Sequence, residues 1–167
     1  MLGLRTIVAA CLMIPFSGYL HCGLAAGGHV TGTVLVTTAE GTVAYGDWVR
    51  VLLVSTPVAV PEPGDLSGLD RQQRIDRLIH LHLDFFNNIQ ARLSEPGYLV
   101  ADTLTTPDGG FKFHSIPPGQ YYLVVTFPSI IRGYKVAWQV AVRIAEGQTR
   151  QIELNNENMA VPTYSRY

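Results

Sequence analysis

Residues 106–125 have the sequence TPDGGFKFHSIPPGQYYLVV, and this segment carries the clearest structural signal of the chain. Asp108-Gly109 predicts a tight turn, because glycine tolerates a positive φ and aspartate can accept a hydrogen bond from its own backbone. Phe111 and Phe113 then alternate with polar residues, which is the period of a half-buried strand. A Pro-Pro-Gly sequence ends that strand, and a second alternating strand follows. This succession predicts an antiparallel β-sandwich.

The composition fits a single globular domain with a neutral surface. The chain has 167 residues, of which 47% are hydrophobic and 15% charged, and its formal net charge is -1. That length is sufficient for one domain with its own hydrophobic core. A net charge so close to zero gives no electrostatic basis for binding nucleic acid or an anionic membrane surface. We therefore expect no nucleic-acid partner.

Residues 1–26 have the features of a signal peptide. Arg5 is the only charged residue of this segment, an apolar run follows it, and the small residues Gly23 and Ala25 permit cleavage after Ala25. Cleavage would leave no membrane span, because no later stretch reaches the roughly 20 apolar residues that a spanning helix needs. The sequence therefore predicts a periplasmic or secreted protein.

Two alternatives to cleavage of residues 1–26 stay open. The segment could be retained as a membrane anchor, although Pro15 and Gly18 interrupt its apolar run, or it could be lipidated at Cys11 or Cys22. Both cysteines of the chain lie in the segment. A cleaved chain would therefore contain no disulfide, no thiolate nucleophile and no cysteine ligand for a metal.

Residues 27–154 predict a mainly β fold, a seven-stranded Greek-key sandwich. The strand from residue 48 to residue 54 is apolar on both faces, so we expect it to be central, with the opposite sheet on one side and a different element on the other. Residues 155–167 are polar, and we expect an extended tail. The expected strands cover residues 28–36, 48–54, 98–105, 111–114, 121–127, 134–144 and 149–154.

One amphipathic helix is predicted as an insertion at about residues 70–94. Asp70 is a plausible N-cap, apolar residues then recur at helical spacing, and Pro96-Gly97 ends the pattern. The apolar stripe is wide enough to pack on a sheet. We therefore expect this helix to cover the second apolar face of the central strand.

Two motifs and their order resemble a known family. Residues 28–34 have the pattern Gly-x-Val-x-Gly-x-Val, and residues 105–121 have Thr-x-x-Asp-Gly-x-Phe-x-Phe followed by Pro-Pro-Gly-x-Tyr, with one extra glycine. With the final strand after Glu146-Gly147, they resemble the carboxypeptidase regulatory-like domain, a transthyretin-like (prealbumin-like) sandwich. The resemblance covers most of residues 28–154 apart from about 57–97. It implies a fold and an exported bacterial protein, and it implies no particular activity.

Enzymes of similar fold have motifs that this sequence lacks. It contains no His-x-x-Glu pair, which metallocarboxypeptidases use to bind zinc. It ends in Tyr-Ser-Arg-Tyr, whereas transthyretin-related hydrolases end in Tyr-Arg-Gly-Ser. The Pro-Gly-x-Tyr turn is not followed by the His-x-His iron pair of intradiol dioxygenases. The sequence therefore favours a protein that is not an enzyme and needs no cofactor.

The weak metal candidates are His80 and Asp84, one helical turn apart. Two ligands on one helix can hold zinc only if another element supplies a third. The simpler interpretation is an exposed pair of small energetic value, with His82 close to the seam between helix and sheet. We expect no metal site, and a metal-dependent enzyme of unknown reaction is kept as the second alternative.

The leading hypothesis is a non-catalytic exported module with a binding or structural role in the cell envelope, where another envelope or secreted protein would be its partner. The alternative is a carbohydrate-binding module of starch-binding-like fold, in which aromatic rings stack on a glycan. A bare sandwich of this type does not need the inserted helix. We therefore look for a functional site around this helix first. The candidate residues for a ligand or partner surface are Trp48, Tyr122, Tyr134, Phe85 and Phe86.

Overall fold

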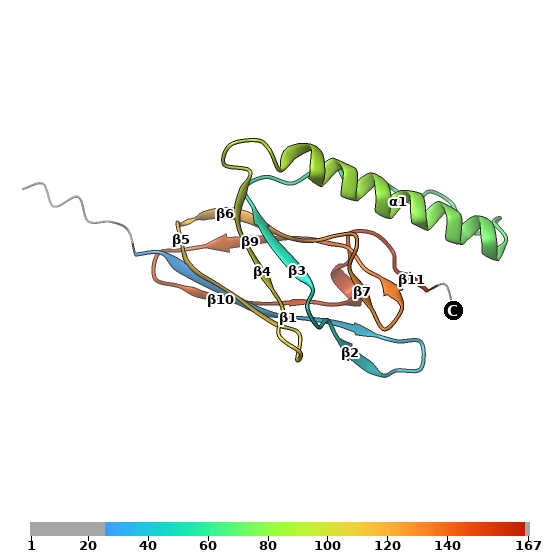
Figure 1. Ribbon diagram of the computed structural model, residues 1–167, viewed down its shortest axis with the longest axis horizontal. Coiled ribbons are helices and arrows are strands. Elements are labelled where there is room, and N and C mark those ends of the chain that lie inside the picture. The colour runs from blue at the N-terminus through green and yellow to red at the C-terminus, as the bar shows by residue number, and fades with distance from the viewer. Residues whose placement is uncertain (1–25, 166–167) are drawn as a thin grey trace, which may run out of the picture.

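Two four-stranded sheets form a sandwich in the computed structural model, which describes residues 26–165 (Figure 1). Their strands are β1 (Gly28–Thr37), β2 (Val43–Tyr45), β3 (Arg50–Val54), β4 (Leu99–Leu104), β5 (Gly110–Ile116), β6 (Gly119–Val125), β9 (Trp138–Ile144) and β10 (Thr149–Leu154). One sheet contains β10, β1, β2 and β5, and the other has the order β4-β3-β6-β9. The predicted mainly β sandwich is confirmed. Residues 1–25, with nearly all of the predicted signal peptide, lie outside the described residues.

Residues of the 106–125 segment fill much of the interior between the sheets. Phe111 and Phe113 of β5 are buried there, and their rings meet edge to face at 6.0 Å. Gly32 of β1 lies opposite Phe111, and a Cβ atom at this position would collide with the Phe111 ring and the Ile152 carbonyl. Ring packing therefore requires the second glycine of the opening motif, and the two sequence motifs meet in one contact.

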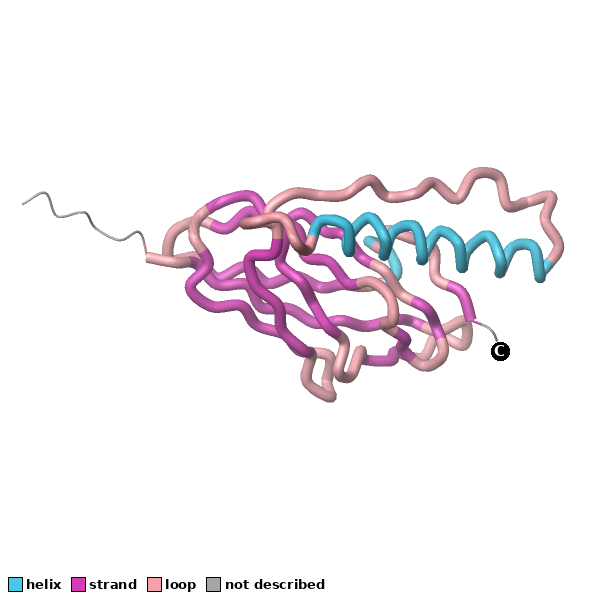
Figure 2. Tube along the Cα trace, turned by 45° about the horizontal axis from the view of Figure 1, so that its top comes forward, coloured by secondary structure: helices cyan, strands magenta, loops and turns pink. Residues whose placement is uncertain are grey.

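Helix α1 (Arg71–Arg92) forms a third layer over the second sheet (Figure 2). It begins at a capping box, in which the Asp70 side chain accepts a hydrogen bond from the Gln73 amide and the Gln73 side chain accepts one from the Asp70 amide. The predicted helix and its N-cap are confirmed. Within residues 26–165, no helix is long and apolar enough to cross a membrane. The buried residues of α1 are Leu78, Leu81, His82, Phe85 and Ile89.

Strand β3 is buried on both faces, as its sequence predicts. Val51 and Leu53 belong to the core between the sheets, whereas Leu52 and Val54 belong to a second core beneath α1. Side chains of a strand alternate between the two sides of a sheet, so four consecutive apolar residues require a cover on each side. The opposite sheet provides one cover and α1 provides the other.

The C-terminal residues differ from the expected extended tail. They form a short 3-10 helix (Asn156–Asn158) and strand β11 (Tyr164–Ser165), which pairs with β8 (Tyr134–Lys135), itself paired with β7 (Ile130–Ile131). Val161 and Tyr164 are buried in the core beneath α1. The strand expected over residues 134–144 is divided into β8 and β9, because residues 134–135 leave the line of β9 and pair with the tail. The tail is thus part of the third layer.

We predict that Phe85→Ala lowers the free energy of unfolding by about 3–5 kcal/mol, because the ring is fully buried between α1 and the sheet. Urea unfolding followed by circular dichroism measures this loss. Asn87→Ala on the exposed face of the same helix is the control, with an expected change within about 0.5 kcal/mol. Equal stability of the two variants would show that α1 is not anchored to the sheet.

Candidate ligand-binding pocket

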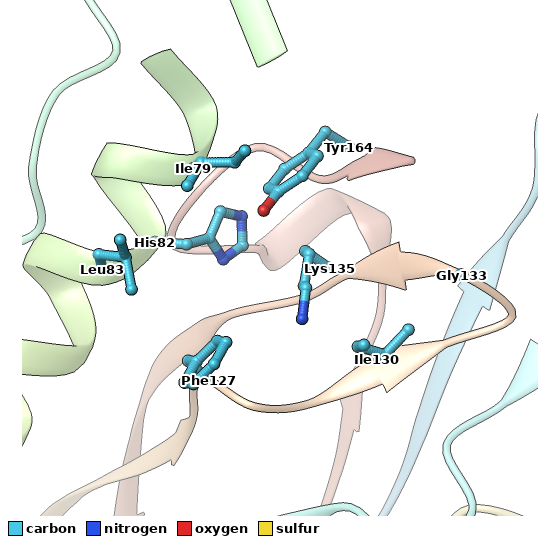
Figure 3. Close-up of a pocket in the computed structure, with 8 residues that line it drawn as sticks. All are labelled: Ile79, His82, Leu83, Phe127, Ile130, Gly133, Lys135 and Tyr164. Atoms are coloured by element: carbon cyan, nitrogen blue, oxygen red, sulfur yellow. The ribbon is translucent and has the colours of Figure 1, made fainter. Parts of the chain in front are cut away.

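A pocket of about 580 Å³ opens between helix α1, the β7–β8 hairpin and strand β11 (Figure 3). Its volume lies within the roughly 300–1,000 Å³ that is usual for small-molecule sites. Three segments that are far apart in the sequence build its wall, so the pocket exists only because the tail and the hairpin pack against the helix. The lining residues are Ile79, His82, Leu83, Phe127, Ile130, Gly133, Lys135 and Tyr164.

The rim of the pocket is apolar and open to solvent. Phe127 is 38% exposed and Ile130 is 50% exposed, and Leu83 faces them from the helix. Isolated apolar side chains are common on protein surfaces, but three of them around one cavity form a contiguous patch. Such a patch beside a concave surface is the arrangement with which proteins bind apolar groups.

His82 forms part of the floor of the pocket and is held in a fixed orientation. Its Nε2 atom lies 3.0 Å from the Pro162 carbonyl oxygen, and its ring meets the Tyr164 ring edge to face at 5.4 Å. Burial lowers the pKa of His82; the Pro162 carbonyl opposes this shift, and the charge of Lys135 adds to it. His82 is therefore neutral near pH 7 and links the helix to the tail.

Lys135 brings a positive charge to this apolar site. Its Nζ atom lies 4.8 Å from the centroid of the Phe127 ring, within the range of a cation–π contact. The Lys135 backbone is fixed from the other side, because it pairs with Tyr164 of β11 and its carbonyl accepts a hydrogen bond of 2.6 Å from the Thr163 hydroxyl. The tail thus positions the cation against the pocket wall.

A smaller cavity of about 140 Å³ adjoins the pocket and shares Phe127 with it. The Phe86 ring from α1 meets the Phe127 ring edge to face at 5.5 Å and contributes to its lining. Thr126 also lines it, with 8% exposure and a hydroxyl oxygen that has no hydrogen-bond partner among residues 26–165. A buried hydroxyl without a hydrogen bond is costly, and Thr126 bears this cost beside the smaller cavity.

The aromatic residues that the sequence singles out do not form one surface. Phe85 is fully buried beneath α1 and takes no part in any surface, whereas Phe86 lies beside the smaller cavity. Tyr122 packs against the core beneath the helix, and Tyr134 packs against the core between the sheets. Trp48 is 69% exposed in the turn before β3, where its φ of 55° is unusual for a residue other than glycine.

The metal candidates lie apart from the pocket on the exposed face of α1. Both His80 and Asp84 are exposed, and the His80 Nδ1 atom lies 2.8 Å from the Asp76 carbonyl oxygen, one turn earlier in the helix. Among residues 26–165, no group of three or more His, Cys, Asp and Glu side chains is placed to hold a metal ion. The pair therefore has no third protein ligand in the part of the chain that the structure describes.

The pocket residues from the hairpin and the tail are not among the candidates that the sequence suggests. Phe127 and Ile130 lie on either side of Pro128 and Ser129, in a stretch without regular alternation. Apolar residues beside a turn, with no strand period to bury them, are the signal that could have marked an exposed apolar site. Nothing in the sequence places Lys135 next to Tyr164, because that contact depends on the path of the tail.

Comparisons with known proteins do not show a family for this chain. No family model matches the sequence, and no curated protein matches it. Solved structures that it resembles are a candidate carbohydrate binding protein from Pseudomonas aeruginosa (16% identity, TM-score 0.45, 78% of this chain and 89% of that one) and the minor pilin of Streptococcus agalactiae (16%, 0.45, 84% and 47%). A third is the major pilin of Corynebacterium diphtheriae (13%, 0.41, 77% and 29%). These identities and TM-scores are too low to carry a functional conclusion, and the chain spans less than half of either pilin.

We predict that the protein becomes less stable as the pH falls below about 6.5, the ordinary pKa of histidine. The pKa of His82 is lower in the folded state than in the unfolded chain, so the unfolded chain takes up the proton first and gains stability. Urea unfolding at about pH 7.5 and about pH 5.5 measures the difference. His82→Gln, whose amide can still donate to Pro162, should reduce it, and His80→Gln on the exposed face should leave it unchanged. An equal pH dependence in all three proteins would contradict this role.

Proposed function

We propose that this chain is a non-catalytic, exported binding module of the carboxypeptidase regulatory-like type, and that it binds a small ligand in the pocket between α1 and the β7–β8 hairpin. The proposed site of action is the cell envelope, periplasmic or secreted, where other envelope proteins would be its partners. The signal-peptide features of residues 1–26 and the two motifs of the sandwich support export and family. The domain division that we propose is a signal peptide over residues 1–26, a sandwich over residues 27–154 with its helical insertion at about 70–94, and a C-terminal segment over residues 155–167.

The observation that carries the binding role is an exposed apolar rim around a cavity of ligand size. Leu83, Phe127 and Ile130 expose apolar surface, and the pocket that they line is about 580 Å³ in volume. Burying such surface against an apolar ligand is favourable by about 25 cal/mol per Å². A bound ligand would cover these residues as α1 covers the sheet.

His82 has a structural contact in the floor of the proposed site. The His82 Nε2 atom faces the Pro162 carbonyl, a contact that fixes the ring between helix and tail. His82 therefore links the pocket floor to the C-terminal tail.

Ligand binding can be tested with Nile red, a neutral apolar dye that becomes fluorescent when it leaves water. We predict saturable fluorescence with the wild-type protein and about tenfold weaker binding to Ile130→Glu, because a carboxylate at the rim resists burial. Val43→Glu is a matched control, since Val43 on β2 is 48% exposed, close to the 50% of Ile130, and lies outside the pocket. No saturable binding to the wild-type protein, or an equal loss in both variants, would refute the pocket as the binding site.

Glycan binding is the second candidate function, and one exposed aromatic pair favours it. Tyr45 at the end of β2 and Trp48 in the following turn are 52% and 69% exposed. Exposed aromatic rings can stack on the apolar faces of sugars. The likeness of this chain to a candidate carbohydrate binding protein does not by itself support this role.

Intrinsic fluorescence can test the glycan hypothesis, because the chain has two tryptophans and Trp138 is fully buried. If Tyr45 and Trp48 form a stacking surface, maltoheptaose should shift the emission of the wild-type protein in a saturable way. Trp48→Ala should abolish the shift, whereas Leu104→Ala, another exposed residue, should retain it. An unchanged emission spectrum at saturating sugar would exclude maltooligosaccharide binding at Trp48.

A further inference from the structure

Two histidines lie side by side on the first sheet, at the end of the sandwich away from the pocket (Figure 1). The rings of His29 on β1 and His114 on β5 meet edge to face, with 5.4 Å between their centroids. Their neighbours Val30 and Phe113 are buried in the core, so strand alternation directs both imidazoles to the outer side of the sheet. His114 is exposed and His29 is half-buried. A solute can therefore reach this pair from the solvent.

A β-bulge brings the two rings together. The register of β1 and β5 shifts between Gly28 and Val30, so that His29 alone faces both His114 and Ser115. Ser115 has a φ of 55°, which is unusual for a residue other than glycine. Bulges of this kind re-aim side chains and are common next to functional sites. Here the bulge directs two imidazole side chains to one place.

The first residue of the processed chain would lie beside this pair. The proposed signal peptide ends at Ala26, so its removal makes Gly27 the first residue. A Cβ atom on Gly27 would lie 2.6 Å from the Ser115 Cα atom, so residue 27 lies directly against the neighbour of His114. A free α-amino group has an ordinary pKa of about 7.7–8.0, and its neutral form supplies a nitrogen lone pair. Cleavage would thus add a third nitrogen donor to the two imidazoles.

We infer that the processed chain binds a divalent transition-metal ion, copper(II) most tightly, through the His29 and His114 imidazoles and the Gly27 α-amino group. Imidazole suits copper, nickel and zinc, and copper(II) binds most tightly among the divalent ions of the first transition row. This inference rests on the proposed export and its cleavage boundary, and it is independent of the pocket. Because the amino group exists only after cleavage, the site is incomplete in the unprocessed chain.

The backbone of β1 favours this ligand set over a chelate made by the chain start alone. A free Gly-Gly-His sequence can also bind copper(II) through its own amide nitrogens, which must first lose their protons. The His29 amide instead donates a hydrogen bond of 2.7 Å to the Gln148 carbonyl, and Gly28 is buried. Using these amides as ligands would cost the start of the strand its pairing. The His114 ring is already in place and requires no such opening.

The proton balance at His29 is also favourable. The Ser115 amide donates to the His29 Nδ1 atom over 3.4 Å, which is long for a hydrogen bond. Coordination through Nε2 moves the proton of the neutral ring to Nδ1, so only this weak contact is given up. The amino group binds after its ammonium form releases a proton, as metal binding to nitrogen ligands generally requires.

Copper titration of the processed protein tests the site. The full chain is exported to the periplasm of a bacterial host, and the intact mass of the purified protein identifies its first residue. Competition with a chelator of known affinity should show one copper(II) ion per chain. His29→Gln and His114→Gln should each weaken binding at least about tenfold, because even the outer-shell partners of metal ligands contribute about 10–100-fold. Circular dichroism verifies that each variant is folded.

Two controls separate this site from general copper binding. His80→Gln removes an exposed histidine from α1 and should leave the affinity within about twofold of the wild type, since His80 is no ligand of the inferred site. The unprocessed chain, purified without export, keeps residue 27 in peptide linkage. It should bind copper(II) at least about tenfold more weakly than the processed chain.

Three outcomes would overturn the inference. A processed chain that begins at a residue other than Gly27 would lack the inferred amino ligand. Copper binding that survives His114→Gln, with nickel(II) held in a diamagnetic planar complex, would assign the metal to the Gly-Gly-His chain start alone. Equal losses in His80→Gln and His114→Gln would show unspecific binding. A chain recovered from the periplasm with residues 1–26 still attached would instead contradict the proposed signal peptide, and Nile red binding tests the pocket separately.

Discussion

The double-sided burial of strand β3 is the constraint on which the rest of this structure depends. Val51 and Leu53 face the opposite sheet, while Leu52 and Val54 face the other way, and burying each such side chain is worth about 1.5–3 kcal/mol. A two-layer sandwich would leave the second pair in water. The chain instead inserts α1 between β3 and β4, and the helix covers that face of the sheet (Figure 1).

The helix also creates the conditions for a binding site, because it covers the sheet face together with the hairpin and the tail. Tyr164 of the tail is buried beneath α1, and the Pro162 carbonyl contacts His82 of the helix. The β7–β8 hairpin pairs with the tail and brings Lys135 to the same place. The scaffold and the candidate site therefore depend on different parts of the chain. The two sequence motifs stabilise the sandwich, whereas α1, the β7–β8 hairpin and the tail build the site.

Much of the scaffold could be predicted from the sequence, and most of the pocket could not. Strand alternation and helical periodicity are local signals, so the seven longer strands and the Asp70 cap are recoverable without tertiary information. Strands β7, β8 and β11 have two residues each, too few to show a period. Phe85 and Phe86 are neighbours in the same apolar stripe, and only the docked orientation of the helix shows that the first is buried and the second is not. The contact of Lys135 with the tail depends entirely on tertiary packing.

Hydrogen–deuterium exchange with and without bound Nile red tests most directly the claim that the layer around α1 forms the binding site. We expect slower exchange in the ligand-bound protein for peptides covering residues 79–83, 127–135 and 162–165, with little change over β1, β5 and β10. Protection confined to residues 43–48 would contradict it, because the ligand would then occupy the exposed aromatic pair at the end of β2. Protection spread evenly over the sandwich would also contradict it, since the dye would then stabilise the whole domain without occupying this pocket.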